Sequence, residues 1–373
     1  MNTKLAQELG LEFPIFAFTH CRDVAAAVSK AGGLGVLGVA GHSIDALKSE
    51  LEWIENEVGD KPYGVDLLLP TKFVGSDAGG EGGEKLDKHI PDEHRAFVNK
   101  LLEDHGVPEL PKDARIGSEF AVGYEQQREV IELVFQHKIS LIASALGPPP
   151  KWMIETAREK GVKVAALAGT VEHARRHVEA GVDIVVAQGT EAGGHTGSIS
   201  TLVLVPEVVD AVHPIPVLAA GGIGNGRQLT AGLALGAQGV WTGSVWLTTE
   251  EAETHPVVKE KFLKAGLGDT LRSRSITGKP ARQLRSAWTD AWDDPSNPDP
   301  LPMPLQPRLV HEAQARISRT AHKNKGAAEL SNYFVGQIVG SLNEVKSVRT
   351  VMEEFAMEYA DTMERLDGWA GDE

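Results

Sequence analysis

The most informative stretch of the sequence is Val182-Asp-Ile-Val-Val-Ala-Gln-Gly-Thr-Glu-Ala-Gly-Gly-His-Thr-Gly197. Residues 183–187 form a short apolar run rich in β-branched side chains, which predicts a buried strand. Gln188 lies at the end of that strand, where the side chain of a barrel strand would point into a pocket. A loop with four glycines follows and contains His195, whose imidazole can move a proton near neutral pH. Because glycine costs conformational entropy, we expect the loop to let a phosphate or ring approach the backbone closely.

The length and composition limit the classes of protein to which this chain can belong. The chain has 373 residues, 42% of them hydrophobic, and a net charge of −15. This length suits one large domain or two ordinary ones. The acidic balance argues against nucleic acid or an anionic membrane as the main partner, although a local nest of backbone N–H groups can still bind an anion.

The sequence also predicts where the protein resides. It contains no run of 18 apolar residues, and residues 1–10 lack an apolar signal core, so we expect a cytoplasmic protein without a membrane span. Cys21 is the only cysteine, which excludes an internal disulfide and a cysteine cluster for metal. We interpret it as a small buried residue rather than a nucleophile.

Short apolar runs alternate with segments of helical periodicity over about the first 245 residues. This alternation predicts a parallel sheet of the α/β class, and eight such units fit a closed (β/α)8 TIM barrel. An open doubly wound sheet would usually place its phosphate-binding glycines after the first strand, whereas here glycines follow the sixth, seventh and eighth. We expect helix caps at Asp23, Ser43 and Thr170. The expected strands cover residues 13–19, 34–38, 63–69, 140–145, 162–167, 183–187, 215–222 and 238–244.

Two regions fall outside this alternation. Residues 70 to about 124 interrupt it after the third strand, and we interpret them as an insertion over one end of the barrel, either a lid or a passive excursion, with a helix around 94–105. Residues 250–373 follow the barrel of residues 1–249, and we expect them to form a C-terminal helical subdomain packed on it. The expected helices there cover residues 251–264, 311–319 and 328–365.

Three stretches carry a resemblance to a known family. The run Ala187-Gln-Gly-Thr-Glu-Ala-Gly-Gly-His-Thr-Gly197 resembles the glycine-rich histidine motif of the nitronate monooxygenases, formerly called 2-nitropropane dioxygenases. Residues 217–228 and 236–247 are similar to the phosphate loops after that family's seventh and eighth strands. The resemblance covers most of residues 10–247 and implies an FMN-dependent (β/α)8 barrel. A phosphate needs unobstructed N–H donors, and barrels often build that site at these strand ends.

The resemblance also implies site residues. His195 would be catalytic, orienting a nitronate or taking an α-proton from a nitroalkane. Gly243 and Ser244 would be the best phosphate donors. Lys279-Pro-Ala-Arg282 is similar to a short basic motif of the family, either a clamp on the active-site side or a helix start. The expected FMN contacts are Ala17, Phe18, Thr19, Asp66, Gln188, Gly193, Gly194, Gly221, Gly222, Trp241, Thr242, Gly243 and Ser244.

The chain departs from the family pattern at two places. Family members usually carry Asn where this sequence has Asp66, and an ionised carboxylate there would oppose a reduced, negatively charged flavin unless protonated or paired. They commonly have Ala-Pro-Met where this chain has Ala17-Phe-Thr-His20, which places a second imidazole near the site. We interpret His20 as structural. The pair His173 and His177 could suggest a metal, but no third ligand accompanies it, so we expect a solvated helix face and no metal site.

The implied reaction is the oxidation of a small alkyl nitronate by dioxygen to a carbonyl compound and nitrite. Its partners would be the small-molecule substrate and dioxygen, and the chain could form a homo-oligomer. Two alternatives stay open: an NAD(P)H-dependent flavin reductase of enoyl thioesters on the same barrel, and a non-catalytic flavin-binding barrel. The presence of His195 beside the glycines argues against the second.

Overall fold

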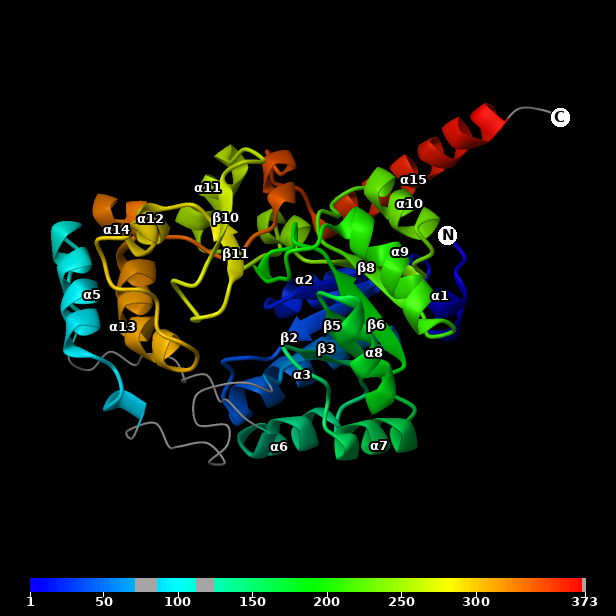
Figure 1. The fold of residues 1–373 in the computed structure, drawn as a ribbon. Coiled ribbons are helices and arrows are strands. Elements are labelled where there is room, and N and C mark those ends of the chain that lie inside the picture. Colours follow the sequence, from blue (N-terminus) through cyan, green and yellow to red (C-terminus); the bar gives the residue numbers. More distant parts are fainter. Residues whose placement is uncertain (71–85, 112–123, 371–373) are drawn as a thin grey trace.

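The computed structural model describes residues 1–70, 86–111 and 124–370 (Figure 1). Eight parallel strands close into a barrel in the order β1-β2-β3-β4-β5-β6-β8-β9, which confirms the predicted (β/α)8 fold. Among the described residues, no helix combines the length and apolarity needed to cross a bilayer. The barrel strands are β1 (Ile15–Thr19), β2 (Leu34–Gly38), β3 (Tyr63–Leu68), β4 (Leu141–Ala145), β5 (Lys163–Ala168), β6 (Ile184–Gln188), β8 (Val217–Ala220) and β9 (Gly239–Thr242).

Side chains of each strand alternate between two buried layers. On β6, Ile184 and Val186 pack inside the barrel, while Val185 and Ala187 pack against the surrounding helices. Because both faces are buried, a strand of this kind reads as a continuous apolar run rather than an alternating one. The interior is filled by side chains, so a binding site has to lie at an end of the barrel.

Helices surround the barrel, and their starts test the predicted caps. Ser43 and Thr170 are confirmed, since their hydroxyls accept from the amides of Ala46 and His173. The predicted cap at Asp23 is wrong, because the helix begins one residue earlier and Asp23 lies in its first turn; an acidic residue suits either position. These helices are α1 (Lys4–Glu8), α2 (Arg22–Lys30), α3 (Ile44–Val58), α6 (Tyr124–Val134), α7 (Lys151–Lys160), α8 (Val171–Ala180), α9 (Thr201–Val212) and α10 (Gly226–Ala234).

The region after the barrel is not wholly helical. Strands β10 and β11 form a hairpin that pairs with β7, a two-residue strand in the glycine loop. The helix predicted over 328–365 is broken by residues 331–347. The elements are η2 (Ser244–Thr248), α11 (Pro256–Lys264), β10 (Thr270–Ser273), β11 (Ala281–Leu284), α12 (Ala287–Asp293), α13 (Leu305–Thr320), α14 (Lys325–Leu330), η3 (Gln337–Ser341) and α15 (Val348–Ala370), with β7 at Gly194–His195.

The C-terminal helices divide between two hydrophobic cores. Helix α15 packs on the barrel through Val348, Met352 and Phe355, beside α2 and α10. Helices α12, α13 and α14 instead share a second core with α5 (Asp92–Asp104), the helix of the insertion. Figure 1 shows α5, in cyan, alongside α13 and away from the barrel.

Contacts other than apolar ones also join the insertion to the C-terminal helices. The Arg308 guanidinium lies 3.0 Å from the Asp87 carboxylate, and His94 Nε2 lies 3.0 Å from the carbonyl oxygen of Asp299. Residues 86–111 therefore belong with the C-terminal helices rather than with the barrel wall. The glycines of residues 79–83 lie outside the described residues, and a lid function stays a prediction.

Leu102→Ala tests the shared core. Leu102 is 1% exposed in α5, and its truncation should lower the free energy of unfolding by about 2–5 kcal/mol through lost burial and a cavity. Leu267→Ala is the matched control, because Leu267 is 61% exposed and should change stability by less than about 0.5 kcal/mol. Urea unfolding measures both. Equal small effects would show that α5 does not depend on this core.

Candidate functional site

A cavity of about 1120 Å³ lies at the carboxyl ends of the barrel strands and continues between the barrel and the C-terminal segments. Ligand pockets usually hold up to about 1,000 Å³, so this one can take a cofactor and a substrate together. Ala17 does not line it, because its side chain packs between strands and helices. The expected residues that do line it are Phe18, Thr19, Asp66, Gln188, Gly193, Gly194, His195, Gly221, Gly222, Trp241, Thr242, Gly243 and Ser244.

His195 is held in place by the C-terminal hairpin. Strand β7 pairs with β11 so that His195 lies opposite Ala281 and Gly194 lies opposite Arg282. The imidazole Nε2 is 2.9 Å from Thr277 Oγ1, and the Phe334 ring lies nearby with a centroid separation of 6.3 Å. Residues from beyond the barrel therefore fix both the backbone and the ring of this histidine.

The hydrogen bonds of Thr277 assign the histidine tautomer. The Thr277 hydroxyl donates to the carbonyl of Lys279 at 3.1 Å and accepts from the Lys279 amide at 3.3 Å. Because its only proton is already donated to Lys279, the hydroxyl can accept a hydrogen bond from Nε2–H of His195 but cannot donate one to Nε2. Among the described residues Nδ1 has no hydrogen-bond partner, so it keeps a lone pair able to accept.

Burial shapes the charges beside this imidazole. It lowers the pKa of His195 to about 4, with the Lys279 ammonium adding to the effect, so the ring is neutral at pH 7. Burial also lowers the pKa of Lys279, which lines the cavity and forms no ion pair within the described part of the chain. Lys279, which has no ion-pair partner among the described residues, can therefore attract an anionic ligand, while Nδ1 of His195 offers an acceptor for a proton.

The carbonyls of the glycine loop are tied to the hairpin by two arginines. Arg282 Nε donates to the carbonyl of Thr190 at 2.7 Å, and Arg272 Nη2 donates to that of Thr196 at 3.1 Å. The basic motif is therefore a clamp on the site, and the alternative of a helix start is wrong because β11 begins at Ala281. Arg272 and Arg282 are directly opposite each other in the hairpin.

Glu191, which also lies in the loop, has a structural role. Its carboxylate accepts from the amide of Thr201 at 3.0 Å and from the Thr201 hydroxyl at 2.9 Å. These bonds satisfy the free amide at the start of α9 and suit the helix dipole. Glu191 therefore anchors the loop to α9.

The glycines serve two different purposes. A Cβ at Gly193 would lie 2.9 Å from the backbone of Val335, and one at Gly189 would lie 2.1 Å from Thr201 Oγ1. At these two positions the neighbouring chain, not a ligand, requires glycine. At Gly243 a Cβ would find nothing closer than the Phe18 ring at 3.8 Å, so the cavity side of this residue is open.

The expected phosphate region combines open backbone with side chains that are already engaged. Gly221 and Gly222 have φ of +101° and +69°, the left-handed region that favours glycine. Ser244 Oγ accepts from the amide of Gly336 at 2.8 Å. Thr242 Oγ1 accepts from the Trp246 indole at 3.0 Å, so its hydroxyl belongs to the barrel wall. Backbone amides at 221–222 and 243–244 are the groups that fit a phosphate.

Other histidines near the cavity are structural. His20 Nδ1 lies 3.1 Å from the carbonyl oxygen of Gly38, and burial lowers the pKa of His20. His177 is 3% exposed and its Nε2 lies 3.0 Å from the carbonyl oxygen of Leu167, so the expectation of a solvated face is wrong for this residue. Within the described ranges, neither His173 nor His177 belongs to a group of possible metal ligands.

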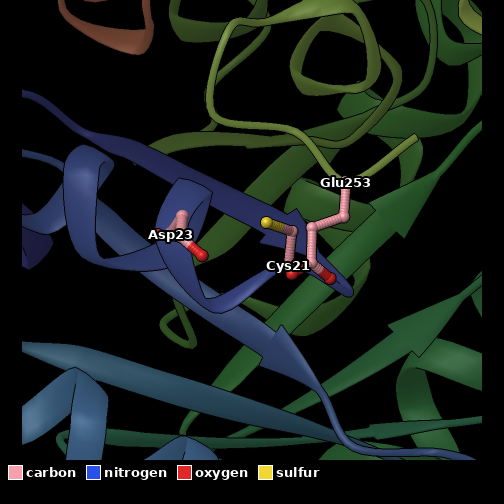
Figure 2. A group of neighbouring side chains, drawn as sticks. All are labelled: Cys21, Asp23 and Glu253. Carbon is pink, nitrogen blue, oxygen red and sulfur yellow. The ribbon is translucent and has the colours of Figure 1, made fainter. Parts of the chain in front are cut away.

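One such group is present at Cys21, Asp23 and Glu253, whose ligand atoms lie within 4.8 Å of one another (Figure 2). Cys21 is 6% exposed and its Sγ lies 3.2 Å from the carbonyl oxygen of Glu251. Burial raises the pKa of the thiol, and the Glu253 charge adds to it. A protonated thiol is a poor nucleophile and a poor metal ligand, so Cys21 fits the predicted role of a buried small residue.

Thr277 and Phe334 are site residues that the sequence did not indicate. Both come from segments after the barrel, and neither stands in a motif. Lys279 had a signal in the basic motif, although the motif does not show that its ammonium reaches the cavity. A hairpin that pairs with a two-residue strand has too little sequence for a periodic pattern.

Thr277→Val tests the tautomer assignment. Valine keeps the shape of threonine but removes the acceptor for Nε2–H, so His195 should lose its single tautomer. Imidazole ¹⁵N chemical shifts measure the protonation of each ring nitrogen. Thr277→Ser is the control and should retain the wild-type shifts. A wild-type ring protonated at Nδ1, or shifts unchanged in the valine variant, would contradict the assignment.

Three comparisons relate this chain to known proteins. Residues 5–358 match the family model described as nitronate monooxygenase. A protein of Mycobacterium tuberculosis named putative monooxygenase Rv1533 is 57% identical over 99% of both chains. Among solved structures, the nitroalkane oxidase of Streptomyces ansochromogenes has a TM-score of 0.79 with 25% identity, covering 97% of this chain and 99% of its own. FabK of Thermotoga maritima has a TM-score of 0.73 with 28% identity, covering 99% of both.

Proposed function

Because the chain belongs to the nitronate monooxygenase family, we propose that it is an FMN-dependent enzyme that oxidises small alkyl nitronates with dioxygen to a carbonyl compound and nitrite. Family membership supports an oxidoreductase and implies a flavin. The observation that carries the finer proposal is the neutral imidazole of His195 beside the Lys279 ammonium in a cavity at the barrel mouth. This ammonium has no ion-pair partner among the described residues.

The residues at the barrel mouth fit a flavin mononucleotide. The amides of Gly221, Gly222, Gly243 and Ser244 offer donors to one phosphate, and the open side of Gly243 leaves room for it. Gln188 adds an amide that can both donate and accept at the end of β6. When bound, FMN would supply the redox chemistry by passing electrons from substrate to dioxygen.

The protein's own groups bind and orient the substrate. Lys279 would attract the negative oxygens of a nitronate. His195 Nδ1, as an acceptor, could take the α-proton of a neutral nitroalkane. An imidazole whose pKa is about 4 is a weak base at neutral pH. The site therefore favours a preformed nitronate over a neutral nitroalkane, whose α-proton His195 would have to remove.

Gly243→Val tests the phosphate position. The added branched side chain should fill space that the phosphate needs without striking the protein, so the variant should fold and lose FMN. Gly268→Val is the control, because a Cβ there meets no atom within 4 Å and the residue is exposed. Flavin content after purification and the mass of the released chromophore are the measurements.

The outcomes of this test distinguish an error in the position of the phosphate from an error in the identity of the cofactor. Retention of FMN by the Gly243→Val variant would show that the phosphate lies elsewhere. Release of FAD from the wild-type protein, or a colourless protein that cannot be reconstituted with FMN, would defeat the cofactor assignment itself.

His195→Asn tests the acceptor. Asparagine stays polar and leaves the phosphate loops untouched, so FMN should remain bound. Oxidation of a neutral nitroalkane should slow by roughly 10²–10⁴-fold, the usual worth of positioned proton transfer. A preformed nitronate has no α-proton to lose, so its kcat/KM should fall less, at matched flavin occupancy. Equal losses would make His195 a binding residue, and no loss on either substrate would remove it from the site.

A flavin-dependent enoyl-thioester reductase is the second candidate. The similarity to FabK supports it, as does a cavity long enough to continue past the barrel toward α13. The electron donor would then be NAD(P)H and not the nitronate. A non-catalytic flavin-binding barrel is disfavoured by the ordered network around His195. Dioxygen as co-substrate and a homo-oligomer remain proposals.

A further inference from the structure

Asp66 is a buried acid that the proposed reaction does not use. It lies on β3, is 6% exposed and lines the cavity at the barrel mouth. Its side chain makes no hydrogen bond and no ion pair within the described residues. In the barrel register it lies opposite Gly38 on β2 and Ala143 on β4, and neither offers its side chain as a partner. With no protein partner among the described residues, this carboxyl group is available to a ligand in the cavity.

Among the described residues, no charged group stabilises the ionised form of Asp66. The titratable side chains that reach this part of the cavity from adjoining elements are His20 after β1 and His42 after β2, while β4 contributes none. His20 is neutral at pH 7, because burial lowers its pKa. More distant on the cavity wall are Arg176 and His177 of α8. Burial alone raises the pKa of Asp66 to about 7.

We propose that Asp66 meets the flavin as a neutral carboxylic acid and donates a hydrogen bond to an acceptor atom of the isoalloxazine, so that FMN binding above neutral pH takes up a proton. The inference rests on the flavin of the proposed function. A carboxylic acid has one O–H donor, whereas a carboxylate can only accept. The carboxylate would also lose its remaining contact with water when the ring covers it, which disfavours the ionised form further.

The test is the pH dependence of FMN affinity in wild-type protein and in Asp66→Asn. Asparagine keeps the shape and a hydrogen-bond donor but does not titrate. The dissociation constant of apo-protein for FMN is measured by flavin fluorescence from about pH 6 to about pH 9, where the FMN phosphate, with its pKa near 6, affects both proteins equally. The informative quantity is the wild-type constant divided by that of the variant.

This ratio should be flat in acid and rise by up to about tenfold per pH unit above about pH 7. A ratio independent of pH would overturn the proposal, as would one that falls with pH, which would mean that a carboxylate accepts from a ring N–H. If neither protein binds FMN, the proposed cofactor fails instead.

Titration calorimetry of FMN binding to the wild-type apo-protein gives a second readout that needs no variant. FMN binding is titrated at about pH 8 in two buffers of different ionisation enthalpy, where the phosphate is already a dianion. Uptake of close to one proton per FMN supports the proposal. Uptake of none contradicts it.

Discussion

The pairing of β7 with β11 is the interaction on which the rest of the site depends. Two residues of the glycine loop join a hairpin that lies far along the chain, and this contact places His195 opposite Ala281. The same hairpin region carries Thr277 to the imidazole and Arg282 to the carbonyl of Thr190. The barrel supplies strand ends and glycines, but the histidine is oriented by residues beyond it.

The hairpin also explains why the glycine loop and the C-terminal region do not form independent domains. Segment 331–347 crosses beside the loop closely enough that a Cβ at Gly193 would strike Val335. Helix α15 returns to pack on the barrel, whereas α13 forms a core with α5 of the insertion. The boundary proposed at residues 249 and 250 therefore separates segments of sequence that build one site together.

Three of the cavity-lining groups with shifted pKa values bear on the proposed function. Burial lowers those of His195 and Lys279 and raises that of Asp66, so in each case the charged form is disfavoured. Near pH 7 His195 is neutral and Asp66 can be, so among these three groups only Lys279 can bring a positive charge to the cavity. Such a cavity binds best a ligand that brings its own negative charge and its own hydrogen-bond acceptors.

The barrel could be predicted from the sequence because its strands are buried on both faces and alternate regularly with helices. The candidate histidine followed from the motif around 187–197. The other expected lining residues followed from the family resemblance there, at the two phosphate loops and at the first and third strands. Ala17 was expected in the cavity because the resemblance assigned the whole end of the first strand to it. Strand alternation decides which side chains of that strand face the cavity, and that of Ala17 does not. Thr277, Phe334 and the hairpin could not be predicted, since their roles depend on tertiary contacts with no local signal.

The choice of electron donor tests the central claim most directly. FMN-loaded protein is mixed without oxygen with either an alkyl nitronate or NADPH, and the flavin absorbance is followed. The account predicts rapid bleaching by the nitronate and little by NADPH, because the Lys279 ammonium, which has no ion-pair partner in the described part of the chain, suits a small anion. Bleaching by NADPH with no response to the nitronate would contradict it and assign the barrel to a reductase.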